Sequence, residues 1–146
     1  MKKTNDVFET AREIRKKIIL KKNVDFSVID FHGEITSEKM AIGHYLDGRA
    51  SLVVGTHTHV PTNDARILSG GTGYMTDAGM CGDYDSVIGM DKNNSIKRFF
   101  KQDSIKHFPS KGKASISGVI VELSKETGLA LKIKSFITGG VLNNTN

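Results

Sequence analysis

The sequence of 146 residues predicts a single α/β unit. Two observations support this prediction. A strand, a helix and a second strand are expected in turn within residues 24–54, which is typical of a βαβ crossover. Two alternating apolar runs at residues 114–123 and 130–137 are typical of a β-hairpin. We expect residues 1–138 to form this unit and residues 139–146 to form a frayed tail.

The first part of the chain is expected to fold as helix, strand, helix and strand. Residues 6–22 place apolar side chains at helical spacing and therefore predict an amphipathic helix. Residues 24–31 and 50–54 are short, β-rich apolar runs that are typical of buried strands. Thr36 or Ser37 can cap the helix that connects these strands.

The middle of the chain is expected to be less regular. Residues 66–68 and 73–76 predict short strands around a glycine-containing turn. Residues 79–89 predict a Gly-rich loop. Its backbone N–H groups are candidates for a phosphate cradle, but the loop matches no phosphate-loop or dinucleotide fingerprint.

Positive charge is concentrated on two predicted helices. The net charge is +5, and much of it lies on residues 6–22 and on a third helix that Asp91 is expected to cap. This helix should run through residue 101, and residues 102–113 should form an exposed loop. Because no aromatic side chains interleave with the charges, a solvated helix face is favoured over nucleic-acid binding.

Composition favours an ordinary globular protein, with 38% hydrophobic and 25% charged residues. The apolar runs are far shorter than the roughly 20 residues that a membrane helix needs. No apolar segment follows Lys2 and Lys3, so a signal peptide is not expected. Cys81 is the only cysteine, which excludes an internal disulfide and agrees with a reducing compartment. We expect a cytoplasmic protein.

Three histidines follow the two strands of the predicted crossover. His32 follows the first strand, and His57 and His59 follow the second. Adjacent parallel strands present their carboxyl ends at one edge of the sheet, where ligands bind. Because neutral imidazole is the commonest metal ligand, a metal site is favoured over three unrelated loop residues. Asp30 is a candidate acceptor for a ligand ring, or it simply ends its strand, and His44 is expected to be no ligand.

Several sequence blocks resemble a known family. The blocks are DFHGEITSEK at residues 30–39, DGRA at 47–50, VGTHTHV at 54–60, GYMTDAGM at 73–80 and GDYDSVIGM at 82–90. In this order they closely resemble the bacterial metallophosphoesterases of the YmdB type, over nearly the whole chain. The resemblance implies a calcineurin-like α/β sandwich that holds two divalent metal ions, iron or manganese, and hydrolyses phosphodiesters such as cyclic nucleotides. It implies that His32 and His57 ligate one metal and that His59 ligates the other.

The chain resembles only the C-terminal half of that family. The family's first half should supply an early Gly-Asp, an Asn-Gly-Glu-Asn segment that bridges the metals, and a Gly-Asn-His segment with the proposed acid histidine. The sequence contains neither Asn-Gly-Glu-Asn nor Gly-Asn-His. We therefore expect a partial sandwich with no catalytic residue of its own, inactive alone.

Two functional interpretations stay open at this point. The first is a phosphodiesterase fragment that works with a separately encoded N-terminal half or as a homo-oligomer. The second is a non-catalytic interaction protein that pairs with other subunits through an exposed sheet edge.

Overall fold

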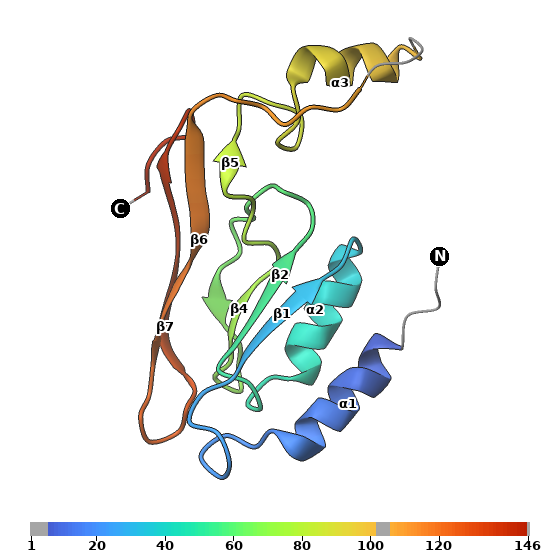
Figure 1. Cartoon of the computed structure of the whole chain (residues 1–146). Helices are drawn as coiled ribbons and strands as arrows, with labels where there is room; N and C mark the ends of the chain where they lie inside the picture. The colour runs from blue at the N-terminus through green and yellow to red at the C-terminus, as the bar shows by residue number, and fades with distance from the viewer. Residues whose placement is uncertain (1–5, 102–105, 146) are drawn as a thin grey trace.

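The computed structural model describes residues 6–101 and 106–145 and contains helices, strands and two sheets (Figure 1). The helices are α1 (Val7–Lys17), α2 (Thr36–Tyr45) and α3 (Lys92–Phe99). The strands are β1 (Val28–His32), β2 (Leu52–Thr56), β3 (Arg66–Ile67), β4 (Gly73–Met75), β5 (Gly82–Asp83), β6 (Ala114–Leu123) and β7 (Ala130–Gly139). In the described part of the chain, no helix has the length and apolar character that crossing a bilayer requires.

The main sheet has four strands in the order β1-β2-β4-β3. Strands β1 and β2 pair in parallel, β2 and β4 pair in parallel, and β3 is antiparallel to β4. The second sheet is antiparallel, in the order β5-β6-β7. The predicted α/β class, the βαβ crossover and the terminal hairpin are therefore confirmed.

The main sheet is packed on both faces (Figure 1). Helices α1 and α2 lie on one face, and the β6–β7 hairpin crosses the other. Two apolar clusters match these layers. The cluster on the helix side contains Ala11, Ile42, Leu46, Ala50, Val53, Leu68 and Tyr74. The cluster on the hairpin side contains Leu52, Val54 and Met75, with Val119, Val121 and Ile133 packed against it.

Helix α1 ends earlier than its apolar spacing predicts, at Lys17 rather than near residue 22. The side chain of Asn23 donates to the Lys17 carbonyl at 2.5 Å and accepts from the Ile19 N–H at 2.8 Å. This side chain competes with the backbone for the groups that would continue the helix. The prediction for α3 is confirmed at its start, where Asp91 accepts from the Asn94 N–H at 2.8 Å, although the helix ends at Phe99.

The end of the chain is more ordered than the expected tail. Strand β7 continues to Gly139, and Thr145 folds back onto it: the Thr145 N–H donates to the Ile137 carbonyl at 3.0 Å, and the Thr145 hydroxyl accepts from the Ile137 N–H at 2.8 Å. Unpaired backbone groups on a strand edge favour such pairing. The expected loop at residues 102–113 falls partly outside the described residues, which exclude 102–105.

Gly55 lies where β2 passes close to the chain after β4. A Cβ atom there would meet the Thr76 carbonyl oxygen at 1.8 Å. We expect Gly55→Ala to lower the free energy of unfolding by about 1–3 kcal/mol, because the backbone must shift to relieve the overlap. Urea denaturation measures the loss. Gly82→Ala is the control, since the nearest atom there is the Met80 sulfur at 3.6 Å; equal losses for both variants would contradict the packing argument.

Candidate metal centre

His32 and His57 meet at the carboxyl ends of two neighbouring strands. His32 is the last residue of β1 and pairs in register with Thr56 of β2, directly before His57. The centroids of the two imidazole rings are 4.9 Å apart, and the ring planes cross at 82°. The His57 Nδ1 and the His32 Nε2 are 3.1 Å apart. The parallel register therefore brings together two of the three histidines that the sequence singled out.

The second ring nitrogen of His32 is held by a short hydrogen-bond chain. Its Nδ1 lies 3.0 Å from the Thr56 hydroxyl oxygen, and that hydroxyl donates to the Asp30 carboxylate at 2.9 Å. Since the hydroxyl proton points to Asp30, the His32 Nδ1 carries a hydrogen and donates it to Thr56. The Nε2 of His32 then carries a lone pair. Asp30 orients the ring through Thr56, an indirect form of the acceptor role expected for it.

The second ring nitrogen of His57 faces a carboxylate. The His57 Nε2 lies 2.5 Å from an oxygen of Glu34. A carboxylate only accepts, so this nitrogen carries a hydrogen, and in the neutral ring the Nδ1 of His57 then carries a lone pair. No role for Glu34 was predicted from the sequence, although it stands two residues after His32 in the same motif block.

The two facing nitrogens are suited to a shared cation. When both rings are neutral, each of these nitrogens bears a lone pair, and two lone pairs 3.1 Å apart repel each other unless a proton or a metal ion lies between them. Nitrogen ligands bind Zn²⁺ at about 2.0–2.1 Å with a tetrahedral arrangement, so two of them lie about 3.3 Å apart. The spacing of these two nitrogens is therefore compatible with two ligands of one divalent metal ion.

His59 is turned away from this pair. Its Nδ1 donates to the Ile88 carbonyl at 2.9 Å, which leaves the Nε2 with a lone pair. Among the described residues, no group of three or more His, Cys, Asp or Glu side chains is placed to hold a metal ion. His59 lies in the loop after β2, as the sequence predicted, but its imidazole ring is not grouped with those of His32 and His57.

The loop that carries His57 and His59 has an unusual backbone. His57 has φ 127° and His59 has φ 64°, a region that residues other than glycine seldom occupy. Each such residue costs on the order of 1–3 kcal/mol and persists only when its surroundings impose it. Strain of this kind is concentrated at functional sites, which agrees with a role for this loop.

The buried ion pair of Lys39 and Asp77 contacts the backbone of the same loop. The Asp77 carboxylate accepts from the Thr58 N–H and the Gly79 N–H, both at 2.9 Å, and from the Lys39 ammonium at 2.7 Å. The Asp77 residue is 0% exposed and Lys39 is 1% exposed. Burial raises the pKa of Asp77, but the hydrogen bonds from Lys39 and the two amides outweigh it, so the pKa lies below its ordinary value.

No role for Lys39 and Asp77 was predicted from the sequence, although the position of Lys39 in α2 indicates a buried charge. Lys39 stands three residues before Ile42 and seven before Leu46, which places a charge on the apolar face of α2. A lysine there needs a buried counter-charge. The distant Asp77 could not be identified as that partner without the tertiary fold.

The remaining chemical candidates lie elsewhere. His44 and His107 are exposed and are not hydrogen-bonded to the histidine pair. The Gly-rich loop uses backbone N–H groups internally: Gly89 donates to the Ser86 hydroxyl and Met80 donates to the Tyr84 hydroxyl. This internal bonding weakens the case for a phosphate cradle.

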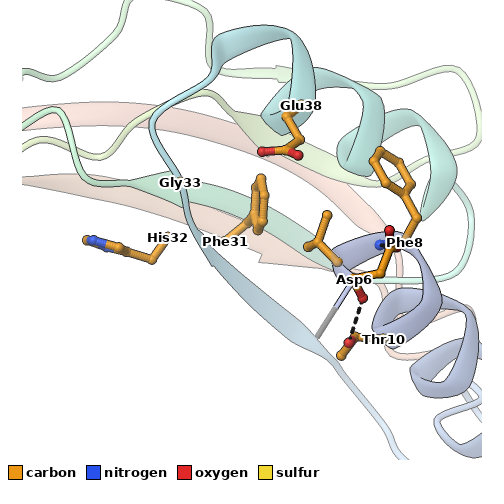
Figure 2. A pocket seen from close by; sticks show the side chains of 8 residues that line it. Asp6, Phe8, Thr10, Phe31, His32, Gly33 and Glu38 are labelled. Carbon is orange, nitrogen blue, oxygen red and sulfur yellow. Dashed lines mark hydrogen bonds between the residues drawn. The ribbon is translucent and has the colours of Figure 1, made fainter. Parts of the chain in front are cut away.

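A cavity of about 510 Å³ lies beside His32, between the first turn of α1 and the carboxyl end of β1 (Figure 2). Residues from three elements line it: Asp6, Val7, Phe8, Thr10, Phe31, His32, Gly33 and Glu38. Of the histidine pair, His32 belongs to this lining and His57 does not.

The sequence and the fold are similar to those of known proteins. The family described as YmdB-like protein matches residues 1–136. Over 116 residues the chain is 49% identical to the 2′,3′-cyclic-nucleotide 2′-phosphodiesterase of Bacillus subtilis (strain 168), and this match covers 80% of the chain and 44% of that protein.

Two crystal structures have closely similar folds. A phosphatase from Mycoplasma pneumoniae has a TM-score of 0.85 and 36% identity, covering 94% of this chain and 48% of that chain. A hypothetical protein from Thermus thermophilus has a TM-score of 0.84 and 37% identity, covering 96% of this chain and 53% of that chain. The chain thus spans about half the length of these proteins.

Proposed function

Because the chain belongs to the YmdB-like protein family, we propose that it forms one half of a metal-dependent phosphodiesterase that acts on cyclic nucleotides. The family resemblance predicted from the sequence blocks is confirmed, and the relatives support phosphodiesterase or phosphatase activity in the family. The observation that carries the proposal for this chain is the pair of facing imidazole nitrogens of His32 and His57, 3.1 Å apart.

The residues of this chain would take distinct parts in such a site. His32 and His57 would hold one divalent ion, iron or manganese, while Glu34 and the Thr56 hydroxyl orient their rings. His59, whose Nδ1 is engaged by the Ile88 carbonyl, would serve a second ion through its Nε2. When bound, the metal ions supply Lewis-acid stabilisation of a phosphoryl oxygen and an activated water.

The described residues provide too few ligands for a complete site. A site for two metal ions needs a negatively charged carboxylate between them, because the two cations repel each other. The histidine pair supplies no such carboxylate. The chain covers only 44% of the Bacillus subtilis relative. The missing ligands and the proposed acid histidine would therefore come from the part of a YmdB-like protein that this sequence does not match.

Hydrolysis of 2′,3′-cyclic AMP in the presence of Mn²⁺ tests this function. We expect no turnover by the purified chain alone. We expect turnover after co-expression with the part of the Bacillus subtilis relative that this chain does not match. The turnover should be lost in His57→Ala and kept in His44→Ala, which changes an exposed histidine outside the pair.

A complex that forms and binds Mn²⁺ but hydrolyses no phosphodiester would contradict the enzymatic proposal. That result would favour the second candidate, a non-catalytic subunit. The observation behind this candidate is the outer edge of β1, which has no neighbouring strand among the described residues.

A further inference from the structure

A cavity of about 350 Å³ lies between α3 and the turn at residues 87–90. Its lining residues are Val87, Ile88, Ser95, Arg98, Phe99 and His107. Ser95, Arg98 and Phe99 stand three and four residues apart on α3 and therefore share one face of the helix. None of the lining residues belongs to the cavity beside His32. Cavities of about 300–1,000 Å³ bind small organic ligands, so this one is large enough for part of a nucleotide.

The turn at residues 87–90 contains a strained residue. The N–H groups of Val87 and Met90 each donate to the carbonyl of the other residue at 3.0 Å. The central residues Ile88 and Gly89 have φ angles of 51° and 89°, a region that β-branched residues rarely occupy. Strain of this kind is concentrated at binding and catalytic sites. Ile88 is 55% exposed and lines the cavity, so the strained turn provides it with an apolar wall.

Ile88 also joins the cavity to the candidate metal centre. Its carbonyl accepts from the His59 Nδ1 at 2.9 Å, and the same residue lines the cavity. Helix α3 lies beyond the carboxyl ends of β1 and β2 (Figure 1), the two strands that the histidines follow. A nucleotide whose phosphate is bound beside His59 would therefore have its sugar and base close to this cavity.

The α3 side of the cavity offers polar groups and an aromatic ring. Ser95 is 3% exposed, and among the described residues its hydroxyl oxygen has no hydrogen-bond partner. Because buried polar groups are nearly always hydrogen-bonded, this hydroxyl indicates a partner on a bound molecule. Phe99 is 80% exposed. Arg98 is also exposed, and its guanidinium carries five N–H donors.

A nucleobase matches this combination better than an inorganic anion or an acyl chain does. The flat faces of a base stack on aromatic rings, and its edge carries hydrogen-bond donors and acceptors. Phe99 and Ile88 suit the faces, while Ser95 and Arg98 suit the edge. An inorganic anion would leave Phe99 and Ile88 without a contact, and an acyl chain would leave the Ser95 hydroxyl without a partner.

We propose that this cavity is the base subsite for the cyclic nucleotide, where Phe99 stacks on the base and Ser95 and Arg98 bond to its edge. The phosphate of the same nucleotide lies at the candidate metal centre, on the other side of Ile88. This inference rests on the function proposed above, and it assigns α3 to substrate recognition.

Nucleoside binding tests the subsite without metal ions and without hydrolysis. The probes are adenosine and cytidine, which carry a purine and a pyrimidine base but no phosphate. Each is added to the ¹⁵N-labelled full chain and followed by NMR. We expect the backbone amide signals of Ile88, Ser95 and Phe99 to shift with at least one nucleoside. Ribose 5-phosphate, which carries a phosphate but no base, should leave these signals unchanged.

Two neighbouring phenylalanines provide matched variants. Phe99 lines the cavity and Phe100 does not, although they are 80% and 77% exposed. We expect Phe99→Ala to raise the dissociation constant of the nucleoside at least about five-fold, because the stacked ring is lost. Phe100→Ala should leave the constant unchanged, and Phe99→Tyr should keep it near the native value. Circular dichroism checks that these surface changes leave the fold intact.

Three outcomes would overturn the proposal. In the first, neither nucleoside binds. In the second, Phe99→Ala weakens binding no more than Phe100→Ala does. In the third, ribose 5-phosphate shifts the same signals, which would identify an anion site. Nucleoside binding without turnover of 2′,3′-cyclic AMP would support the base site and count against the phosphodiesterase, whereas turnover without nucleoside binding would do the reverse, so the two proposals fail separately.

Discussion

Replacing Asp77 with alanine is expected to lower the free energy of unfolding by about 3–5 kcal/mol, because it leaves the ammonium of Lys39 buried without its partner. Asp77 is fully buried and Lys39 nearly so, and their charged atoms are 2.7 Å apart. The variant also frees the Thr58 and Gly79 N–H groups that the carboxylate accepts from. Total stabilities of proteins are about 5–15 kcal/mol, so the loss is a large fraction of the whole. Urea denaturation followed by circular dichroism measures it.

Three further variants separate the ion pair from other effects. Lys39→Met should cost about as much as Asp77→Ala, since it leaves the carboxylate without its cation. The double variant Lys39→Met/Asp77→Leu should cost less than the sum of the single changes, because it leaves no unpaired charge. Asp85→Ala breaks an exposed pair with Lys92 of similar length, 2.6 Å, and should cost at most about 1 kcal/mol. A similar loss for Asp85→Ala and Asp77→Ala would contradict this account.

The same variant has an expected pH dependence. The pKa of Asp77 in the folded chain lies below its ordinary value of 3.8. A depressed pKa means that the carboxylate stabilises the fold above the unfolded pKa and that this contribution is lost as pH falls through the folded pKa. The difference in stability between the native chain and Asp77→Ala should therefore be constant near neutral pH and shrink below about pH 4.

Loss of either histidine of the pair is expected to weaken Mn²⁺ binding by at least about 100-fold. Removing a partner that only orients a ligand typically costs 10–100-fold, about 1–3 kcal/mol, and removing the ligand itself costs more. His32→Ala and His57→Ala are therefore predicted to bind Mn²⁺ far more weakly in isothermal titration calorimetry. Glu34→Gln should show the smaller effect of about 10–100-fold, since Glu34 contacts only the far nitrogen of His57.

His44→Ala is the control for these variants, because His44 is an exposed histidine at the end of α2. Its affinity for Mn²⁺ should equal that of the native chain. An unchanged metal content in His57→Ala, with the fold intact, would refute the assignment of the pair. A loss of affinity in His44→Ala of the same size would show that Mn²⁺ binds histidines on the surface without a specific site.

Much of the fold could be predicted from short-range patterns. The alternation in residues 114–123 and 130–137 predicted the hairpin, because a period of two puts one side of each strand against the core. Asp91 was recognised as a helix cap because its carboxylate needs only the amide three residues later. The end of α1 was misplaced, since the side chain of Asn23 competes with the helix by bonds that apolar spacing does not reveal.

The candidate site was predicted in part. The placement of His32 and His57 at strand ends followed from the βαβ order, which brings the carboxyl ends of both strands to one edge. The orientation of His59 toward Ile88 did not follow, because the Ile88 carbonyl lies 29 residues away in the sequence. The role of Glu34 depends on the ring of His57, which reaches it only once β1 and β2 are paired.

The sequence by itself determined the α/β class, the crossover, the hairpin and the family, because each depends on the order and local pattern of residues. Only the tertiary structure decided which imidazole nitrogens face each other, which partner neutralises Lys39, and how the strands of the main sheet are ordered. These features depend on contacts between residues far apart in the chain, such as Lys39 and Asp77, 38 residues apart. The local sequence pattern indicates that a buried charge needs a partner of opposite charge, but only the tertiary fold shows which residue is that partner.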